Sequence, residues 1–125
     1  MKVFGGSLFA WLLLVSAVGA QDLCQLIAGA SVIADDGTFL GKLTSEYSSD
    51  SILNEYGTYG SPYSSNSIWN EYGQYGGAYS SLSPFNAYTS TPPILVKRGK
   101  VIALLTVNKS LRGALNPYIV KSCEF

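Results

Sequence analysis

A sixteen-residue segment occurs three times in succession in the middle of the chain, over residues 47–62, 63–78 and 79–94. The third copy keeps only the first ten positions of the pattern. The residues that recur at constant positions include Ser51, Ser67 and Ser83, then Asn54, Asn70 and Asn86, and then Tyr56, Tyr72 and Tyr88. A fixed period of this kind indicates one small supersecondary unit that is used repeatedly. The rest of the chain must therefore fold around a repeat array.

Each copy begins with a tyrosine and two serines, and the first two copies carry glycines in their second half. Serine hydroxyls can accept hydrogen bonds from the first amides of a helix, and the spacing of Ile52, Tyr56 and Tyr59 is that of one helix face. Glycine suits the left-handed residue that ends a helix. We therefore expect one or two helical turns per copy. A β-solenoid with stacked asparagines is the alternative, although the copies contain few β-branched residues.

The segments that flank the array resemble each other. Residues 31–44 and residues 93–107 both show short apolar runs around a glycine-containing turn, and Asp36-Gly37 is a typical two-residue hairpin turn. A single hairpin is only marginally stable in water, so the two hairpins should pair with each other. We expect an α+β fold, in which a small antiparallel sheet from both hairpins carries the three helical-turn repeats of residues 47–94. Residues 22–30 should form a short helix.

The N-terminal twenty residues have one lysine, a long apolar run and small residues at the end. This pattern is typical of a secretory signal peptide, with cleavage before Gln21. An uncleaved membrane anchor is the alternative, because the apolar run is nearly long enough to span a bilayer. The sequence thus predicts a signal peptide at residues 1–20 and a single exported domain at residues 21–125. That domain would be periplasmic or secreted and would have no transmembrane span.

Two cysteines lie at opposite ends of the predicted domain, Cys24 and Cys123. In an exported chain an even number of cysteines favours a disulfide. A bridge between these two would close almost the whole domain into one loop and would stabilise it by about 4–5 kcal/mol in the chain-entropy model. A reactive or metal-binding thiol pair is the weaker alternative.

The chain contains no histidine and equal numbers of acidic and basic residues, eight of each. The usual Ser-His-Asp and Cys-His catalytic groups are thereby excluded, and the balanced charge argues against nucleic-acid binding. We expect no cofactor and no metal. A calcium site at Asp35 and Asp36 is disfavoured, because the spacing matches no EF-hand loop.

The charges are unevenly distributed along the chain. Acidic residues dominate residues 21–91, where Lys42 is the single basic residue. Basic residues dominate residues 92–125, where Glu124 is the single acidic one. The simpler interpretation is attraction within the fold, and the alternative is head-to-tail association of a polar molecule or contact with an anionic surface.

With its Asn-x-Tyr-Gly-x-Tyr-Gly repeats and the Asn116-Pro117-Tyr118 motif in the tail, the chain resembles a family of small exported bacterial proteins. That family carries N-P-Y-G-x-Y-G-S repeats flanked by G-x-[FY]-L-G-x-L segments. The resemblance covers residues 36–118. Glu55 and Glu71 stand where the family pattern has proline. The family has no established activity, so the resemblance implies an exported bacterial protein and supplies no catalytic residues.

Aromatic residues of the array are the candidate ligand-binding residues: Tyr56, Tyr59, Trp69, Tyr72 and Tyr75. Aromatic rings beside hydroxyl and amide groups bind sugars, and tyrosine is enriched where proteins bind proteins. The alternative is that these tyrosines fill the interior of the array. The partner is unknown, and envelope polysaccharide and envelope protein are the two candidates.

We therefore expect a non-enzymatic exported binding or scaffold module of the bacterial envelope. One alternative is a small hydrolase of envelope polysaccharide that uses carboxylates. Glu55 and Glu71 would be its candidate pair, but equivalent repeat positions predict similar environments and a catalytic acid and base need different ones. A second alternative is a purely structural, self-associating envelope component.

Overall fold

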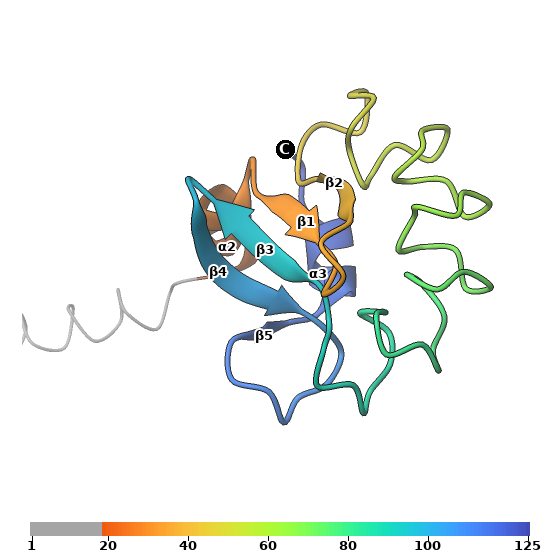
Figure 1. The fold of residues 1–125 in the computed structure, drawn as a ribbon. Coiled ribbons are helices and arrows are strands. Elements are labelled where there is room, and N and C mark those ends of the chain that lie inside the picture. The colour runs from red at the N-terminus through yellow and green to blue at the C-terminus, as the bar shows by residue number, and fades with distance from the viewer. Residues whose placement is uncertain (1–18) are drawn as a thin grey trace, which may run out of the picture.

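The computed structural model describes residues 19–125, and residues 1–18 of the proposed signal peptide lie outside the described part. The signal peptide therefore stays a prediction. The elements in chain order are α2 (Ala20–Ile27), β1 (Ser31–Ile33), β2 (Phe39–Lys42), β3 (Ile94–Lys97), β4 (Lys100–Leu105), β5 (Ala114–Leu115) and α3 (Pro117–Lys121) (Figure 1). The expected small α+β class is confirmed. Within residues 19–125 no helix has the length and apolar character needed to cross a membrane.

The five strands form one sheet in the order β2-β1-β3-β4-β5. Neighbours from β2 to β4 pair antiparallel, whereas β5 pairs parallel to β4. The expectation of an antiparallel sheet is therefore wrong at this edge. Ala114 pairs with Leu104, one residue before the end of β4, so the loop of residues 106–113 needs to carry the chain back along the strand direction by only about 3.3 Å.

The two hairpin turns differ in length. Around Asp35–Gly37, the Ala34 amide donates to the Thr38 carbonyl and the Gly37 amide donates to the Ala34 carbonyl, with Gly37 at a φ of 87°. This loop is one residue longer than the predicted Asp36-Gly37 turn, and a left-handed glycine at its third residue is common in such loops. The β3–β4 connection is a two-residue turn, in which Arg98 and Gly99 both have positive φ values of 54° and 75°.

The array between β2 and β3 is a succession of turns, and residues 45–92, all of which the structure describes, contain no helix. Backbone amides bond to the carbonyl three residues earlier, and the donors follow one another at intervals of three residues. In the second copy these donors are Ser64, Ser67, Asn70, Gly73 and Gly76. Gly77 also bonds to the carbonyl of Gly73, which adds one residue and brings the period to sixteen. In Figure 1 the array forms an arc beside the sheet.

The expected helical turns are therefore absent from these copies. Serine and asparagine side chains accept a hydrogen bond from the amide two residues further along the chain, as the Ser67 hydroxyl does from the Trp69 amide. Such local bonds compete with the four-residue spacing of an α-helix. The same residue types serve as helix N-caps, which is why the sequence suggested helical turns.

One buried cluster joins the sheet, the helices and the array. The sheet contributes Val32, Leu40, Leu95 and Leu105. The array contributes Ile52 and Ile68 from its first two copies, and Leu82 of the third copy packs against the cluster. Pro84, which occupies the position equivalent to Ile52 and Ile68, is also fully buried. Because every copy is anchored in the same core, the array and the sheet should unfold together.

The structure contains the predicted disulfide between Cys24 of α2 and Cys123, which follows α3, with the two Cα atoms 5.6 Å apart. Helix α2 is the short helix predicted for residues 22–30, and it begins and ends a few residues earlier than predicted. Asn116 begins α3, and its side chain accepts a hydrogen bond from the Tyr118 amide. The Asn-x-Tyr motif in the tail therefore makes the same local bond as the Asn-x-Tyr motifs of the array.

Candidate functional site

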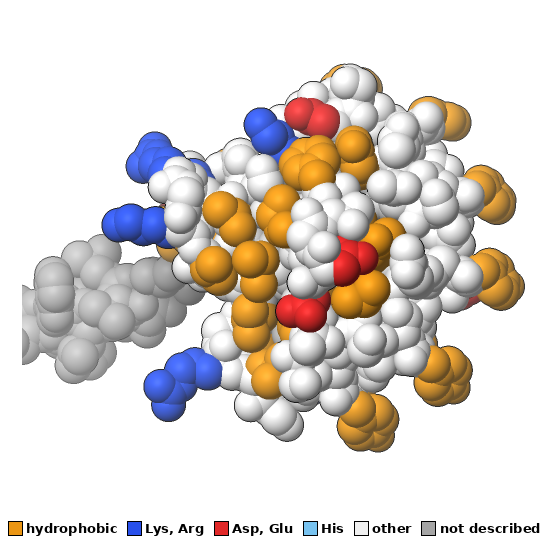
Figure 2. All heavy atoms as spheres, in the orientation of Figure 1, with side chains coloured by type: hydrophobic (Ala, Val, Ile, Leu, Met, Phe, Trp, Pro, Cys, Tyr) orange, Lys and Arg blue, Asp and Glu red, His pale blue; other side chains and the backbone are white. Residues whose placement is uncertain are grey.

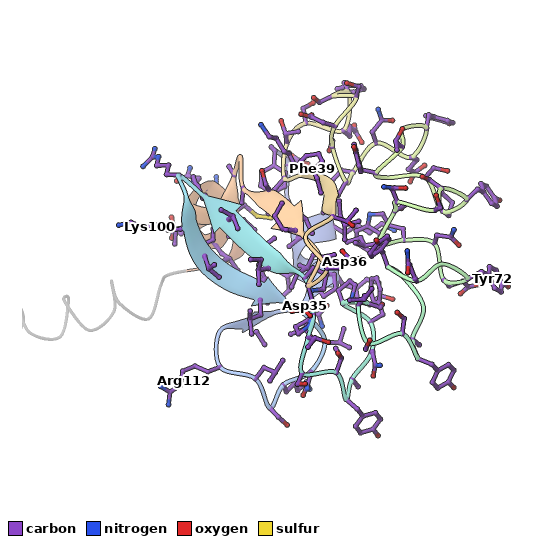
Figure 3. All side chains as sticks on the ribbon, viewed as in Figure 1. Asp35, Asp36, Phe39, Tyr72, Lys100 and Arg112 are labelled. Atoms are coloured by element: carbon purple, nitrogen blue, oxygen red, sulfur yellow. A yellow bond between two sulfur atoms is a disulfide. The ribbon has the colours of Figure 1, made fainter. Side chains whose placement is uncertain are left out.

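Six tyrosines stand on the outer side of the arc, and we call them the tyrosine rim. They occupy the first and the tenth position of every copy, as Tyr47 and Tyr56, Tyr63 and Tyr72, and Tyr79 and Tyr88. Their exposed fractions run from 87% to 99%. Figure 2 shows hydrophobic side chains projecting along the outer edge of the arc, and Tyr72 points away from the body in Figure 3. The rim therefore presents aromatic rings to solvent at two fixed repeat positions.

The repeated asparagines explain how the array holds its shape. The side-chain oxygen of Asn70 accepts a bond from the Tyr72 amide at 3.1 Å, and its nitrogen donates to the Ser64 carbonyl at 3.0 Å. Asn54 and Asn86 make the equivalent pair of bonds in their copies. Each asparagine thus joins two turns of its copy.

The repeated serines and glycines have structural roles of the same kind. Ser67 is fully buried, and its hydroxyl accepts the Trp69 amide at 3.1 Å. Ser51 and Ser83 make the equivalent bonds. A Cβ atom on Gly76 would lie 2.2 Å from the carbonyl oxygen of Asn70, so that position accepts no side chain without moving the backbone.

The structure separates the five candidate ligand-binding residues. Tyr56 and Tyr72 belong to the rim. Tyr59 is half-buried, and its ring packs edge-on against Phe39 with the centroids 5.1 Å apart. The candidate set therefore does not share a single surface.

The other two candidates face the interior. Trp69 is half-buried, and its indole nitrogen donates to the Ile52 carbonyl at 2.6 Å, which links the second copy to the first. Tyr75 is 5% exposed, and its hydroxyl donates to the Asp36 carboxylate at 2.8 Å. The sequence set omits the four remaining rim tyrosines, Tyr47, Tyr63, Tyr79 and Tyr88. Their recurrence at two fixed positions was the signal that could have identified them.

The contact between Tyr75 and Asp36 ties the array to the β1–β2 turn. The Thr38 amide donates to Asp36 at 3.0 Å, and the Tyr75 hydroxyl lies 3.0 Å from the Thr38 hydroxyl. The Thr38 amide, followed by the Thr38 and Tyr75 hydroxyls, lowers the pKa of Asp36 below its ordinary value of 3.8. On the rim, a hydrogen bond to Glu46 and the negative charge of that residue raise the pKa of Tyr47.

A groove of about 1440 Å³ runs between the first two copies and the C-terminal residues. Its floor carries three mutually tilted aromatic rings. The Phe85 ring lies 5.6 Å from the Trp69 ring and 5.3 Å from the Tyr118 ring, measured between centroids. The amine of Lys121 lies 4.9 Å from the centre of the Trp69 ring, which is the geometry of a cation–π contact.

Four glutamates line the groove, namely Glu46, Glu55, Glu71 and Glu124. Among the described residues that line it, Lys121 is the only basic one. Glu55 and Glu71 are both exposed, so the two carboxylates of the proposed hydrolase share one kind of environment. A general acid and a general base need different environments, and the geometry gives the hydrolase no support. Over residues 19–125 no three potential metal ligands of the Cys, Asp or Glu type come together.

No family model, curated protein or solved structure matches the chain. The resemblance to exported bacterial repeat proteins therefore stays a hypothesis, and the functional argument depends on the geometry of the array.

Proposed function

We propose that the protein is a non-enzymatic, exported binding or scaffold module of the bacterial envelope and that it contacts its partner through the tyrosine rim. One observation carries the proposal. Six almost fully exposed aromatic side chains occupy the same two positions in all three copies. The disulfide supports export, because such bonds persist mainly in oxidising compartments.

A comparison of the copies with one another supports the assignment of the rim. The third copy has lost both glycines and has Ala87 where the others have glutamate. It keeps Ser83 and Asn86, whose side chains bond to the backbone. It also keeps Tyr79 and Tyr88, whose rings are 99% and 94% exposed. The hydrogen bonds of Ser83 and Asn86 to the backbone explain why the third copy keeps these two residues. Tyr79 and Tyr88 make no such contribution to the fold, and contact with a partner molecule would explain why they are kept.

Envelope polysaccharide is the partner class that the rim suits best. Tyrosine offers a flat apolar face together with a hydroxyl, and it loses little conformational entropy when it is fixed. A row of such rings can stack on successive sugar residues of a linear polymer, with the phenol groups bonding to sugar hydroxyls. A protein partner is the competing class, because tyrosine is also enriched at protein interfaces.

The test is retention of residues 21–125, in oxidised form, on immobilised envelope polysaccharide. The rim variant is Tyr72→Ser/Tyr79→Ser/Tyr88→Ser, and none of these three residues lines the groove. The matched control is Thr58→Ala/Gln74→Ala/Ser90→Ala, which changes exposed residues at the twelfth position of each copy. We expect the wild type and the control to be retarded and the rim variant to elute unretarded.

Equal retention of the rim variant and the wild type would remove the rim as the contact surface. If polysaccharide retains neither protein and an isolated envelope protein is bound through the same tyrosines, the partner class changes and the rim assignment stands.

A further inference from the structure

The floor of the groove already holds one cation. Lys121 projects from the end of α3, and its amine lies over the Trp69 ring. Aromatic faces attract cations, and they attract the planar guanidinium of arginine in particular, because it also stacks. Lys121 covers the Trp69 ring, whereas the neighbouring Tyr118 ring is 61% exposed, so the floor still offers an aromatic ring to a further positively charged group.

The walls favour the same kind of occupant. Glu55 and Glu71 come from equivalent positions of the first two copies, and both are exposed at the groove. Glu124 adds a carboxylate from the C-terminal side. Carboxylates above an aromatic floor are complementary to a basic segment, and the groove is large enough for a few residues of another chain.

The chain carries a matching segment in the turn between β3 and β4. Lys97, Arg98, Gly99 and Lys100 follow one another there, and the last three are exposed. Lys97 donates to the Leu26 carbonyl at 2.9 Å, which leaves Arg98 and Lys100 as the cations at the tip. Lys100 points away from the body of the protein in Figure 3.

Arg98 is held in an unfavourable backbone conformation. Its φ is 54°, and within residues 19–125 it is the only residue other than glycine with a positive φ. Two-residue turns of this type favour asparagine, aspartate or glycine at that position. Strain of this kind is concentrated at functional sites, so an arginine at this position indicates a role for its side chain.

The turn and the groove belong to opposite parts of the molecule. In Figure 1 the β3–β4 turn lies on the side of the sheet that is remote from the array, and the groove is formed by the array and the C-terminal segment. Figure 2 shows basic side chains on the side away from the arc. The turn of one copy is therefore placed to meet the groove of another copy.

We propose that the groove receives the β3–β4 turn of a second copy of this chain. The Arg98 guanidinium stacks on the Tyr118 ring of the aromatic floor, which is 61% exposed, and Lys100 pairs with Glu55 and Glu71. Because the two contact surfaces differ, each pair of bound copies still presents one unoccupied groove and one unoccupied turn. Association then continues head to tail into an open chain of copies. This inference does not depend on the function proposed for the rim.

The experiment is sedimentation of the oxidised domain over a concentration series at low and high ionic strength. We expect the wild type to form assemblies at low salt that dissociate at high salt, since exposed charges are screened. Arg98→Gly removes the guanidinium and relieves the strained φ, so it should fold at least as well as the wild type. We expect it to associate at least about tenfold more weakly, as for an interface arginine. Arg112→Gly, an exposed arginine elsewhere with the same charge change, is the control and should associate like the wild type.

A mixing experiment makes the test specific. Arg98→Gly keeps an intact groove, and Glu55→Gln/Glu71→Gln keeps an intact turn. At a concentration at which the wild type just associates, each variant alone should be monomeric, and an equimolar mixture should form heterodimers that do not grow further. A wild type that stays monomeric at every concentration overturns the proposal. So does an Arg98→Gly variant that associates like the wild type, or a mixture that stays monomeric. The rim variant should still associate, so the two proposals can fail separately.

Discussion

The sheet and the array are stabilised in different ways. The sheet uses ladders of backbone hydrogen bonds and buries Val32, Leu40, Leu95 and Leu105 in the core. The array buries few apolar side chains, with Ile52, Ile68 and Pro84 at the same position of the three copies, and serine and asparagine side chains add hydrogen bonds to the backbone bonds that close its turns. In the array, the residues that maintain the fold are thus distinct from the exposed residues. The tyrosine rim belongs to the exposed residues.

The largest expected effect concerns the bridge that closes both regions into one loop. Cys24 and Cys123 are 99 residues apart in sequence, so removing the disulfide frees almost the entire domain. We expect Cys24→Ser/Cys123→Ser to lower the free energy of unfolding by about 4–5 kcal/mol. Urea unfolding with fluorescence and circular dichroism measures this loss. Unfolding of the array before the sheet would show that the two regions do not share one cooperative core.

Gly76 gives the next largest effect and tests the close packing of the turns. A Cβ at this position would lie 2.2 Å from the Asn70 carbonyl oxygen and 2.6 Å from the Ile68 carbonyl oxygen. We expect Gly76→Ala to lower the free energy of unfolding by about 3 kcal/mol, as for severe overpacking. Gly73→Ala is the matched control, because its Cβ would come no closer than 3.3 Å to the Asn70 side chain and 3.5 Å to the Asn70 carbonyl oxygen.

We expect Gly73→Ala to lower the free energy of unfolding by less than about 1 kcal/mol, because it causes only mild overpacking. The third copy supports this expectation, since Thr89 occupies the position equivalent to Gly73. Equal losses for the two alanine variants would contradict the turn geometry.

Asn70 tests the polar bonds that replace apolar burial in the array. Asn70→Ala removes one hydrogen bond to the Tyr72 amide and one to the Ser64 carbonyl. We expect a loss of about 2 kcal/mol, from two bonds of about 1 kcal/mol each. Asn66→Ala is the control, since Asn66 accepts only from the exposed Ser65 hydroxyl and should change stability by less than about 0.5 kcal/mol. Thermal unfolding of Asn70→Ala and Asn66→Ala, each compared with the wild type, measures both losses of stability.

The link between the regions gives a pH-dependent effect. Hydrogen bonds from Thr38 and Tyr75 lower the pKa of Asp36 below its ordinary 3.8. The folded state therefore gains stability above the ordinary pKa, and this gain is lost as the pH falls through the lower folded value. We expect Tyr75→Phe to make the loss of thermal stability between about pH 5 and pH 2 shallower than in the wild type. An unchanged pH profile would show that the Tyr75 hydroxyl does not act on this carboxylate.

The parts of the structure that the sequence predicted are those with strong local or topological signals. The repeat period, the short helix near residues 22–30 and the Cys24–Cys123 bridge were all expected. The turns of the array were mistaken for helical turns, because serine and asparagine cap a helix and close a turn with similar local bonds. Only the positions of the amide donors, three residues apart, distinguish the two structures.

The arrangement of the site was harder to predict, because it depends on contacts between distant segments. A helical face would have grouped Tyr56 with Tyr59, whereas the turn geometry exposes Tyr56 and packs Tyr59 on Phe39. The floor of the groove combines Trp69 and Phe85 with Tyr118 from the tail. Trp69 and Phe85 occupy the same position of successive copies, but no local pattern in the sequence brings Tyr118 to them.

The most direct test of the account compares what the rim and the interior of the array contribute to stability. The measurement is the free energy of unfolding in urea for Tyr72→Ser/Tyr79→Ser/Tyr88→Ser and for Asn70→Ala. Exposed side chains usually contribute within about 0.5 kcal/mol each, so the three tyrosines together should change stability by less than about 1.5 kcal/mol. The single asparagine should cost about 2 kcal/mol. A larger loss in the tyrosine variant than in Asn70→Ala would show that the rim holds the fold, and would contradict its assignment as a contact surface.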